Sequence, residues 1–136
     1  MKRGAAAAVP VDAYDALYRG FRWQVPREFN WFEACCARWA RATPDALALI
    51  CEHERGDVAQ FNFADLHGTA LRLAAALAAL GVARGDRVAI VMPQRFETAA
   101  AHIACQRLGA IAMPLSILFG PDALAFLNRL VTRDVA

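Results

Sequence analysis

RVAIVMPQRFETAAAHIACQRLGAIAMPLS, residues 87–116, decides the fold of this chain, because two apolar runs flank a segment of helical character. The runs 87–92 and 110–116 have the length of β-strands. The segment Gln94–Leu108 between them ends at Gly109, a helix-stop signal. This order predicts a βαβ unit with two parallel strands and a right-handed crossover. The turn after the first strand carries no glycine, so the unit lacks a phosphate-binding loop.

The region before this unit predicts a β-hairpin followed by a long helix. The apolar run 46–51 and the alternating run 58–63 have strand length, and a Gly-Asp turn signal lies between them. Asn62 is expected to cap the helix with Asp65 three residues later, and Gly81 is expected to end it. The buried stripe of this helix is expected to comprise Leu66, Ala70, Leu73, Leu77 and Leu80.

The N-terminal part of the chain has a different character. Residues 1–13 are expected to form a disordered leader, and residues 14–30 an aromatic and basic arm with no core of its own. The aromatic side chains of the arm are expected to pack against a neighbouring surface. A helix is predicted to begin with Asn30 as N-cap and Glu33 closing a capping box. Its apolar face is expected to comprise Trp31, Phe32, Cys35, Cys36 and Trp39.

Composition and charge argue against several classes of function. Fifteen basic and thirteen acidic side chains give a net charge of +2, which is too balanced to indicate binding to nucleic acid. No apolar run reaches the roughly 20 residues of a membrane span, and the cytoplasm is the expected compartment. The four cysteines form no CxxC pair, and the three histidines are not at ligand spacing from them, so no metal site is expected.

Cys105 and His102 lie one helical turn apart in the predicted helix. A catalytic Cys-His pair also needs an exposed thiol of low pKa and an orienting third group. The sequence shows neither feature, so Cys105 is interpreted as a structural residue and no catalytic residue is predicted.

Two candidate ligand sites follow the two parallel strands, because open α/β sheets bind ligands beyond the carboxyl ends of their strands. After the first strand come Gln94, Arg95 and Glu97 at a helix N-terminus, where free N–H groups attract anions. Helix capping by Glu97 explains the same pattern. After the second strand, residues 116–121 combine a hydroxyl, an aromatic ring and a glycine. Helix initiation at Pro121 would by itself explain this pattern as well.

Three segments of the sequence occur in an informative order: FRWQVPREFNWFEACCARWA, TPDALALI, and a long stretch from FNFADLHG through GDRVAIVMPQ to RLGAIAMPLSILFGPDAL. They resemble the N-terminal part of AMP-forming acyl-CoA synthetases, members of the adenylate-forming ligase superfamily, and most of all its acetyl-CoA and medium-chain branches. The resemblance runs from Tyr14 to Leu124. It implies an α/β fold in which a β-hairpin, helices and a βαβ unit form a partial N-terminal subdomain. Residues 14–136 would then be an N-terminal fragment of the AMP-binding domain.

The resemblance also implies a reaction. Enzymes of this family use ATP and Mg²⁺ to convert a carboxylic acid into an acyl-adenylate and pyrophosphate, and then transfer the acyl group to coenzyme A. Their phosphate loop and other catalytic motifs lie after the region matched here. The chain is therefore expected to hold no cofactor and to be inactive alone. Its expected partners are the acid and coenzyme A in the full-length enzyme, and a second polypeptide that supplies the rest of the domain.

The stretch SILFGPDAL, residues 116–124, corresponds to a loop that lies beside coenzyme A in acetyl-CoA synthetases. The resemblance implies that Ser116, Phe119 and Gly120 contact coenzyme A. The final residues, AFLNRLVTRDVA, follow the family pattern only roughly, and the sequence is interpreted as a truncated fragment.

Two alternatives are left open by the residues themselves. The first is a non-catalytic binding or assembly module that docks through exposed sheet edges and its apolar arm. The second is a small nucleotide-binding domain that binds ATP or coenzyme A by itself.

Overall fold

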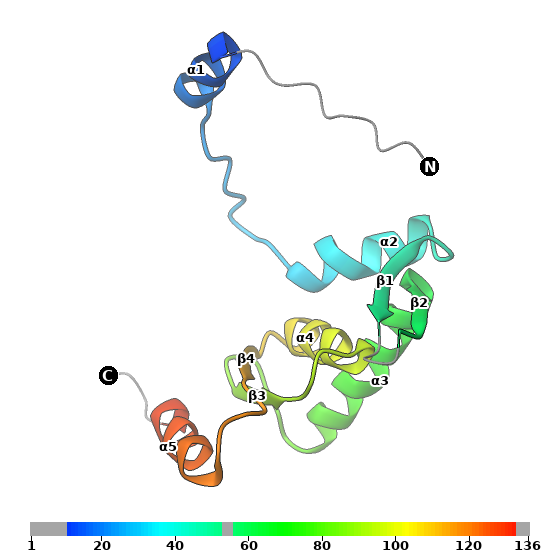
Figure 1. Cartoon of the computed structure of the whole chain (residues 1–136), viewed down its shortest axis with the longest axis vertical. Coiled ribbons are helices and arrows are strands. Elements are labelled where there is room, and N and C mark those ends of the chain that lie inside the picture. Colours follow the sequence, from blue (N-terminus) through cyan, green and yellow to red (C-terminus); the bar gives the residue numbers. More distant parts are fainter. Residues whose placement is uncertain (1–10, 53–55, 133–136) are drawn as a thin grey trace.

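The structure is a computed structural model that describes residues 11–52 and 56–132 (Figure 1). It is a mixed α/β structure, which confirms the predicted fold class. Its elements in chain order are α1 (Val11–Gly20), the π-helical turn η1 (Glu33–Ala37), α2 (Arg38–Ala42), β1 (Leu47–Glu52), β2 (Val58–Asn62), α3 (Phe63–Ala79), β3 (Arg87–Val91), α4 (Phe96–Leu108), β4 (Ile111–Leu115) and α5 (Pro121–Thr132). Within the described residues the strands pair as β1–β2 and as β3–β4.

The βαβ unit predicted from residues 87–116 is present. β3 and β4 pair in parallel along their whole length, in a register that places Arg87 opposite Ile111. α4 connects the two strands and ends at Gly109, whose φ of 70° lies in the left-handed region that glycine favours. The predicted order of strand, helix and strand is therefore confirmed.

The hairpin and the helix after it also follow the prediction. β1 and β2 are antiparallel, and Asn62 at the end of β2 caps α3. Its Oδ1 accepts from the Asp65 N–H at 2.8 Å, and the Asp65 carboxylate accepts from the Asn62 N–H at 3.1 Å, so both bonds of the capping box form. Leu80 was wrong as a core position. It is the C-cap residue of the helix and is 82% exposed.

The core is centred on the packing of α3 against α4. The buried residues that these two helices contribute are mostly small: Leu66, Ala70, Ala74, Thr98, Ala100, Ala101, Ala104 and Cys105. Small side chains let two helices approach closely. Cys36 of the preceding helix packs on Leu66 and Ala100, and Phe61 of β2 stacks on Phe96 with ring centroids 4.0 Å apart. The hairpin and η1 are thereby fixed to the helix pair.

The helix before the hairpin differs from its prediction. Asn30 Oδ1 accepts from the Glu33 N–H at 3.2 Å, as expected of an N-cap. The Glu33 carboxylate, however, accepts from Arg41 rather than returning a bond to Asn30. The hydrogen bond from Arg41 lowers the pKa of the Glu33 carboxyl. A π-helical turn has more residues per turn than an α-helix, which brings side chains eight positions apart to the same side.

The apolar face of this helix is narrower than its sequence indicates. Phe32 and Cys36 are buried as predicted, whereas Trp31, Cys35 and Trp39 are exposed. Cys35 as a core residue was therefore wrong. The helix buries Phe32, Cys36 and Ala37. Trp39 stacks on Phe63 with ring centroids 6.1 Å apart although it is partly exposed.

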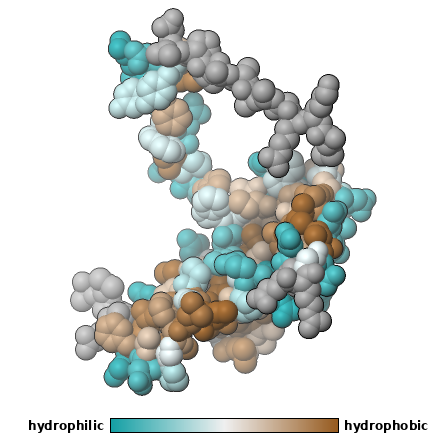
Figure 2. Space-filling model, in the orientation of Figure 1, coloured by the Kyte–Doolittle hydropathy of each residue, from teal (hydrophilic) through white to brown (hydrophobic). Residues whose placement is uncertain are grey.

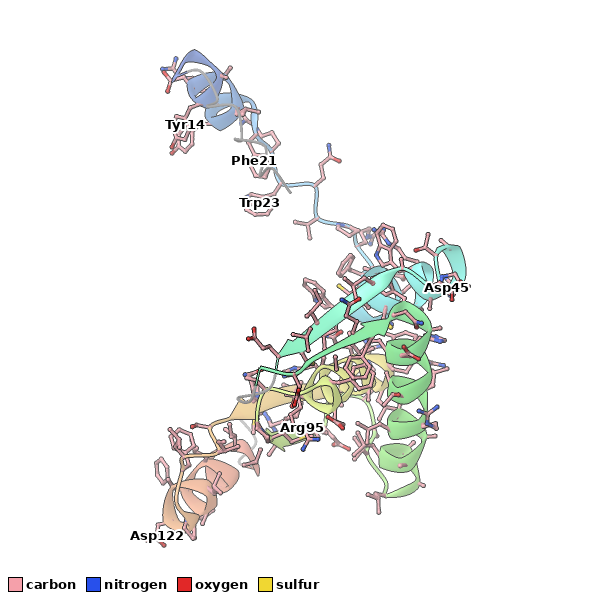
Figure 3. The ribbon with its side chains drawn as sticks, turned by 45° about the vertical axis from the view of Figure 1, so that its right-hand side comes forward. Tyr14, Phe21, Trp23, Asp45, Arg95 and Asp122 are labelled. Carbon is pink, nitrogen blue, oxygen red and sulfur yellow. The ribbon has the colours of Figure 1, made fainter. Side chains whose placement is uncertain are left out.

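α1 and the arm after it lie apart from the other described elements (Figures 1 and 3). Tyr14 stacks on Tyr18 with ring centroids 6.0 Å apart, and Phe21 meets Trp23 edge to face at 5.0 Å. All four side chains are more than half exposed, so they contact one another instead of the neighbouring surface that the sequence predicts. The first ten residues of the predicted leader lie outside the described part of the chain, and its last three belong to α1.

The two faces of β3 should respond differently to truncation. Ile90 is 5% exposed and packs against Ala101 and Cys105 of α4. Ile90→Ala removes buried methylene groups and leaves a cavity, so we expect a loss of about 2–4 kcal/mol in the free energy of unfolding. Val91→Ala, on the next residue and 42% exposed, should cost less than about 1 kcal/mol. Urea unfolding followed by circular dichroism measures both losses. Equal losses would contradict the assignment of the two faces.

Candidate functional site

The loop from Ser116 to Gly120 follows β4 and leads into α5. Ser116 Oγ accepts from the Leu118 N–H at 3.1 Å, and the Ser116 carbonyl accepts from the Phe119 N–H at 3.2 Å. These two bonds fold the loop into a tight turn. The Gly120 carbonyl accepts from the Leu124 N–H at 3.1 Å and so begins the helix. A Cβ added at Gly120 would meet no atom within 4 Å, so packing does not require glycine there.

The turn leaves an aromatic ring and a hydroxyl available to a ligand. Phe119 is 42% exposed, and the Ser116 hydroxyl is still able to donate because its oxygen is the acceptor in the turn. Asp122 stands in the first turn of α5, directly after the loop (Figure 3). Its negative charge disfavours a phosphate group at this helix N-terminus. The loop is therefore suited to stacking on a planar, uncharged ring such as a nucleobase.

A cleft of about 370 Å³ lies at the carboxyl end of β3, between the hairpin and α4. Its volume is within the range of small-molecule sites. Figure 3 shows Arg95 where α4 begins, beside the hairpin. The polar side chains in its walls are Cys51, Glu52, Gln94, Arg95, Thr98 and His102.

Two of these polar side chains, Thr98 and Arg95, are engaged within the fold. Thr98 is buried, and its hydroxyl donates to the Pro93 carbonyl at 2.6 Å, which closes the turn between β3 and α4. Arg95 Nε lies 3.4 Å from the Glu97 carboxylate, and both side chains are more than half exposed. Such an exposed pair is weak, because water screens it. These contacts support helix initiation, which was the alternative explanation of this turn.

The cleft and the loop after β4 are separate. The walls of the cleft end at Leu115, while Ser116, Phe119 and Gly120 lie beyond it. Sequence reasoning missed Cys51 and Glu52, because they reach the cleft only through the packing of the hairpin against α4. The stack of Phe61 on Phe96 that creates this packing joins residues 35 positions apart, and no local pattern indicates such a contact.

Two of the four cysteines, Cys36 and Cys105, have the environments of structural residues rather than nucleophiles. Cys105 and Cys36 are fully buried, and burial raises the pKa of both thiols. An activated cysteine needs the opposite shift, towards a lower pKa. Cys105 packs with Ile90 and Ala101 in the core, which is the environment expected of a structural residue.

Residues 11–52 and 56–132 hold no group of three or more His, Cys, Asp or Glu side chains that could bind a metal ion. None of the helices in these residues has the length and apolar character that crossing a membrane requires.

Comparison with known sequences assigns most of the chain to one family. The family model described as "AMP-binding enzyme" matches residues 36–132. The chain is 38% identical over 100 residues to the acetyl-coenzyme A synthetase of Methylobacillus flagellatus, a match that covers 74% of this chain and 15% of that protein. It is 39% identical over 100 residues to the propionate–CoA ligase of Salmonella typhimurium, covering 73% of this chain and 15% of that protein.

Two solved structures resemble most of this chain. The crystal structure of IdnL1 matches with a TM-score of 0.67 at 27% identity, over 81% of this chain and 22% of that one. The crystal structure of CmiS6 matches with a TM-score of 0.66 at 27% identity, over 82% of this chain and 27% of that one. The chain thus spans about a quarter of these structures, and about 15% of the two curated relatives named above.

The rate of thiol labelling should distinguish the exposed Cys35 from the buried Cys36 and Cys105. Cys35 is exposed, whereas Cys36 and Cys105 are buried with raised pKa values, so little of their thiolate forms near neutral pH. A disulfide reagent should therefore modify Cys35 at least about tenfold faster than either buried thiol. Mass spectrometry of labelled peptides measures the rates, and unfolding in urea should make them converge. Equal rates at Cys35 and Cys105 in the folded chain would mean that Cys105 is accessible and activated.

Proposed function

This chain belongs to the AMP-binding enzyme family, and on that premise we propose that it forms the N-terminal scaffold of an AMP-forming acyl-CoA synthetase. The observation that carries the proposal is the family match over residues 36–132, which include the hairpin, the α3–α4 pair and the β3–β4 unit. The names of the relatives, an acetyl-coenzyme A synthetase and a propionate–CoA ligase, support coenzyme A ligation as the activity of the whole enzyme.

The proposed reaction has two steps. The carboxylate of the acid attacks the α-phosphorus of ATP, which gives an acyl-adenylate and releases pyrophosphate. The thiol of coenzyme A then attacks the acyl carbon, which gives a thioester and releases AMP. Mg²⁺ would accompany ATP, but the described residues offer no cluster of carboxylates to hold it, so no part of the metal chemistry is assigned to this chain.

The role of the chain in this reaction is structural support. Its sequence contains no glycine-rich phosphate loop, and both strand ends that could face a ligand are built for helix initiation. Positioning of a triphosphate and stabilisation of its transition state require donors that surround the phosphates. We therefore propose that the 136 residues alone activate no acid.

The loop after β4 is proposed to contact the nucleotide part of coenzyme A. In this proposal the exposed ring of Phe119 stacks on the adenine, and the Ser116 hydroxyl donates to a polar atom of the nucleotide. Gly120 leaves open space beside the ring, which lets a planar group approach the backbone.

The alternative function is a non-catalytic module that assembles with another protein. The observation in its favour is the number of large apolar side chains exposed on both sheets, among them Leu47, Ile50, Val58, Val91 and Ile111. Under the scaffold proposal the same surface is covered by the rest of the domain, in the same polypeptide or in a second one. Size-exclusion chromatography with light scattering distinguishes the scaffold from the assembly module. A stable complex with a protein that contains no AMP-binding sequence would favour the module.

The chain alone should not release pyrophosphate from ATP. The assay contains the purified 136-residue chain, ATP, Mg²⁺, coenzyme A and a panel of acids from acetate to fatty acids. The propionate–CoA ligase of Salmonella typhimurium, with propionate, is the positive control. Calorimetry with ATP should likewise show no binding. Pyrophosphate release, or tight binding of ATP, would falsify the proposal that this region is scaffold alone.

Substitution of Phe119 should weaken the use of coenzyme A but not of ATP. The variant is made in a chimera that joins this chain to the remaining residues of the Methylobacillus flagellatus relative. Phe119→Ala removes one ring stack worth about 1 kcal/mol, so we expect the KM for coenzyme A to rise about fivefold with an unchanged KM for ATP. Leu118→Ala is the matched control, because Leu118 lies in the same loop and is 88% exposed. Equal effects of the two substitutions would remove Phe119 from the coenzyme A site.

A further inference from the structure

α1 and the irregular segment after it have an apolar side that no other described element covers. Four of its residues follow the i, i+3, i+4, i+7 spacing of one helix face, and two more stand at alternate positions of the segment after α1. We call this surface the arm face, and it consists of Tyr14, Leu17, Tyr18, Phe21, Trp23 and Val25. The edge-to-face contact of Phe21 with Trp23 joins the helical part of the arm face to the part after it. All six side chains are between 57% and 84% exposed.

The arm face lies clear of the hairpin and of the α3–α4 pair. Figure 2 shows hydrophobic and hydrophilic residues alternating along the arm, and Figure 3 shows Tyr14, Phe21 and Trp23 along its length. The ring contacts of the arm face are internal, with Tyr14 on Tyr18 and Phe21 against Trp23. Large apolar side chains gain free energy when they leave water, and a contiguous exposed group of them marks a surface that binds a partner.

Positive charge is concentrated beside the arm face. Residues 18–27 contain Arg19, Arg22 and Arg27 and no acidic residue, while the rest of the chain has twelve basic and thirteen acidic side chains. Arg19 lies 3.4 Å from Asp15, but both side chains are more than half exposed, so this ion pair is weak. The Arg22 guanidinium donates to the backbone carbonyls of Arg19 and Phe21, which leaves its charge unneutralised. A chain of nearly balanced charge therefore has one basic segment that complements an anionic surface.

The composition of the arm face distinguishes between anionic partners. Nucleic acids offer bases on which aromatic rings stack and phosphates for arginine, but no apolar surface that would cover Leu17 and Val25. A second copy of α1 would cover them, but its ten residues are far fewer than the three to four heptads of a coiled coil. A lipid bilayer suits every group. Aliphatic side chains enter the acyl boundary, Tyr and Trp rings lie at the level of the headgroups, and arginines meet lipid phosphates.

We propose that the arm face binds the surface of a bilayer that contains anionic lipids. α1 lies in the plane of the headgroups, with the arm face towards the acyl chains. Asp15 and Arg19 are on the opposite side of the helix, at 100° per residue, and face water. Arg22 and Arg27 contact the lipid phosphates. The proposal rests on the arm alone and does not depend on the acyl-CoA synthetase function proposed above.

Vesicle flotation with the purified 136-residue chain tests the proposal. One set of vesicles is phosphatidylcholine alone, and in the other about a third of the lipid is phosphatidylglycerol. Each arginine near an anionic surface adds to binding, so the partition coefficient at low salt should be at least about tenfold larger for the anionic vesicles. It should fall as the salt concentration rises. No binding to the anionic vesicles, or equal binding to both sets, would overturn the proposal.

Paired variants test whether binding occurs through the arm face. Phe21→Ser with Trp23→Ser should lower partition into anionic vesicles at least about tenfold, because two rings no longer leave water. Leu80→Ser with Phe126→Ser is the matched control, because these residues are 82% and 55% exposed, against 84% for Trp23 and 57% for Phe21, and lie outside the arm face. The control should bind as the original chain does. Equal losses in the two pairs would overturn the proposal. All four side chains are exposed, so circular dichroism should show an unchanged fold.

Arg22→Gln with Arg27→Gln should remove the preference for anionic vesicles and leave binding to phosphatidylcholine unchanged. A preference that persists without these two charges would contradict the assigned role of the arginines. Fluorescence gives a second readout in a chain with Trp31→Phe and Trp39→Phe, in which Trp23 is the remaining tryptophan. Its emission should shift to shorter wavelength with anionic vesicles, because the ring leaves water. An unchanged emission on bound vesicles would place Trp23 outside the bilayer.

Single-stranded RNA is the competing ligand in the same assays. Binding of RNA that is lost with Phe21→Ser and Trp23→Ser, together with no binding to anionic vesicles, would overturn the proposal in favour of base stacking. Binding to vesicles through the arm face would leave the acyl-CoA synthetase proposal unaffected. Pyrophosphate release by the chain would contradict the scaffold role but not the binding of the arm to lipid.

Discussion

The packing of α3 against α4 is the contact on which the other elements depend. α4 supports β3 through Ala101 and Cys105, and it supports the hairpin through Phe96. Leu66 of α3 packs on Cys36 and so holds η1. Half of the buried residues in the described part of the chain are alanines. Each alanine removes little apolar area from water, so the hydrophobic stabilisation per residue is small. Large apolar side chains such as Ile50, Val58 and Ile111 remain at least half exposed beside this small core, which is consistent with the proposed scaffold role.

The sequence correctly predicted the features that depend on neighbouring residues alone, such as helix caps and helix ends. The capping box of Asn62 and Asp65 and the left-handed residue Gly109 lie where hydrogen-bonding and backbone rules place them. The prediction was wrong where tertiary packing decides. Cys35 belongs to an apolar periodicity, but the helix contacts the chain along a strip too narrow to include it. The π-helical turn and the pairing of Glu33 with Arg41 have no counterpart in an α-helical pattern, because an ideal α-helix separates positions eight apart by about 80° around its axis.

For the candidate sites too, the sequence predicted what depends on local patterns and missed what depends on tertiary packing. The loop after β4 was located from sequence, because a strand end followed by Gly-Pro-Asp is a local pattern, and its internal bonds are those of a turn. For the cleft beside Arg95, the sequence indicated the wall at the start of α4. It did not indicate the opposite wall, because that wall comes from the hairpin. The absence of a phosphate loop from the βαβ unit is consistent with the supporting role proposed for this chain. Chemistry in such a fold depends on groups contributed by segments distant in the chain, and a single supporting segment contains few of them.

The alanine-lined contact between α3 and α4 has a consequence for assembly. Alanine has no side-chain rotamers to lose, so this interface becomes ordered at little cost in conformational entropy. Two helices joined in this way present β3 at a fixed spacing and orientation before any neighbour arrives. A preorganised template reduces the entropic cost of each later docking step, because only the incoming segment has to be ordered. The least bulky residues of the chain therefore set the geometry to which the rest of the domain conforms.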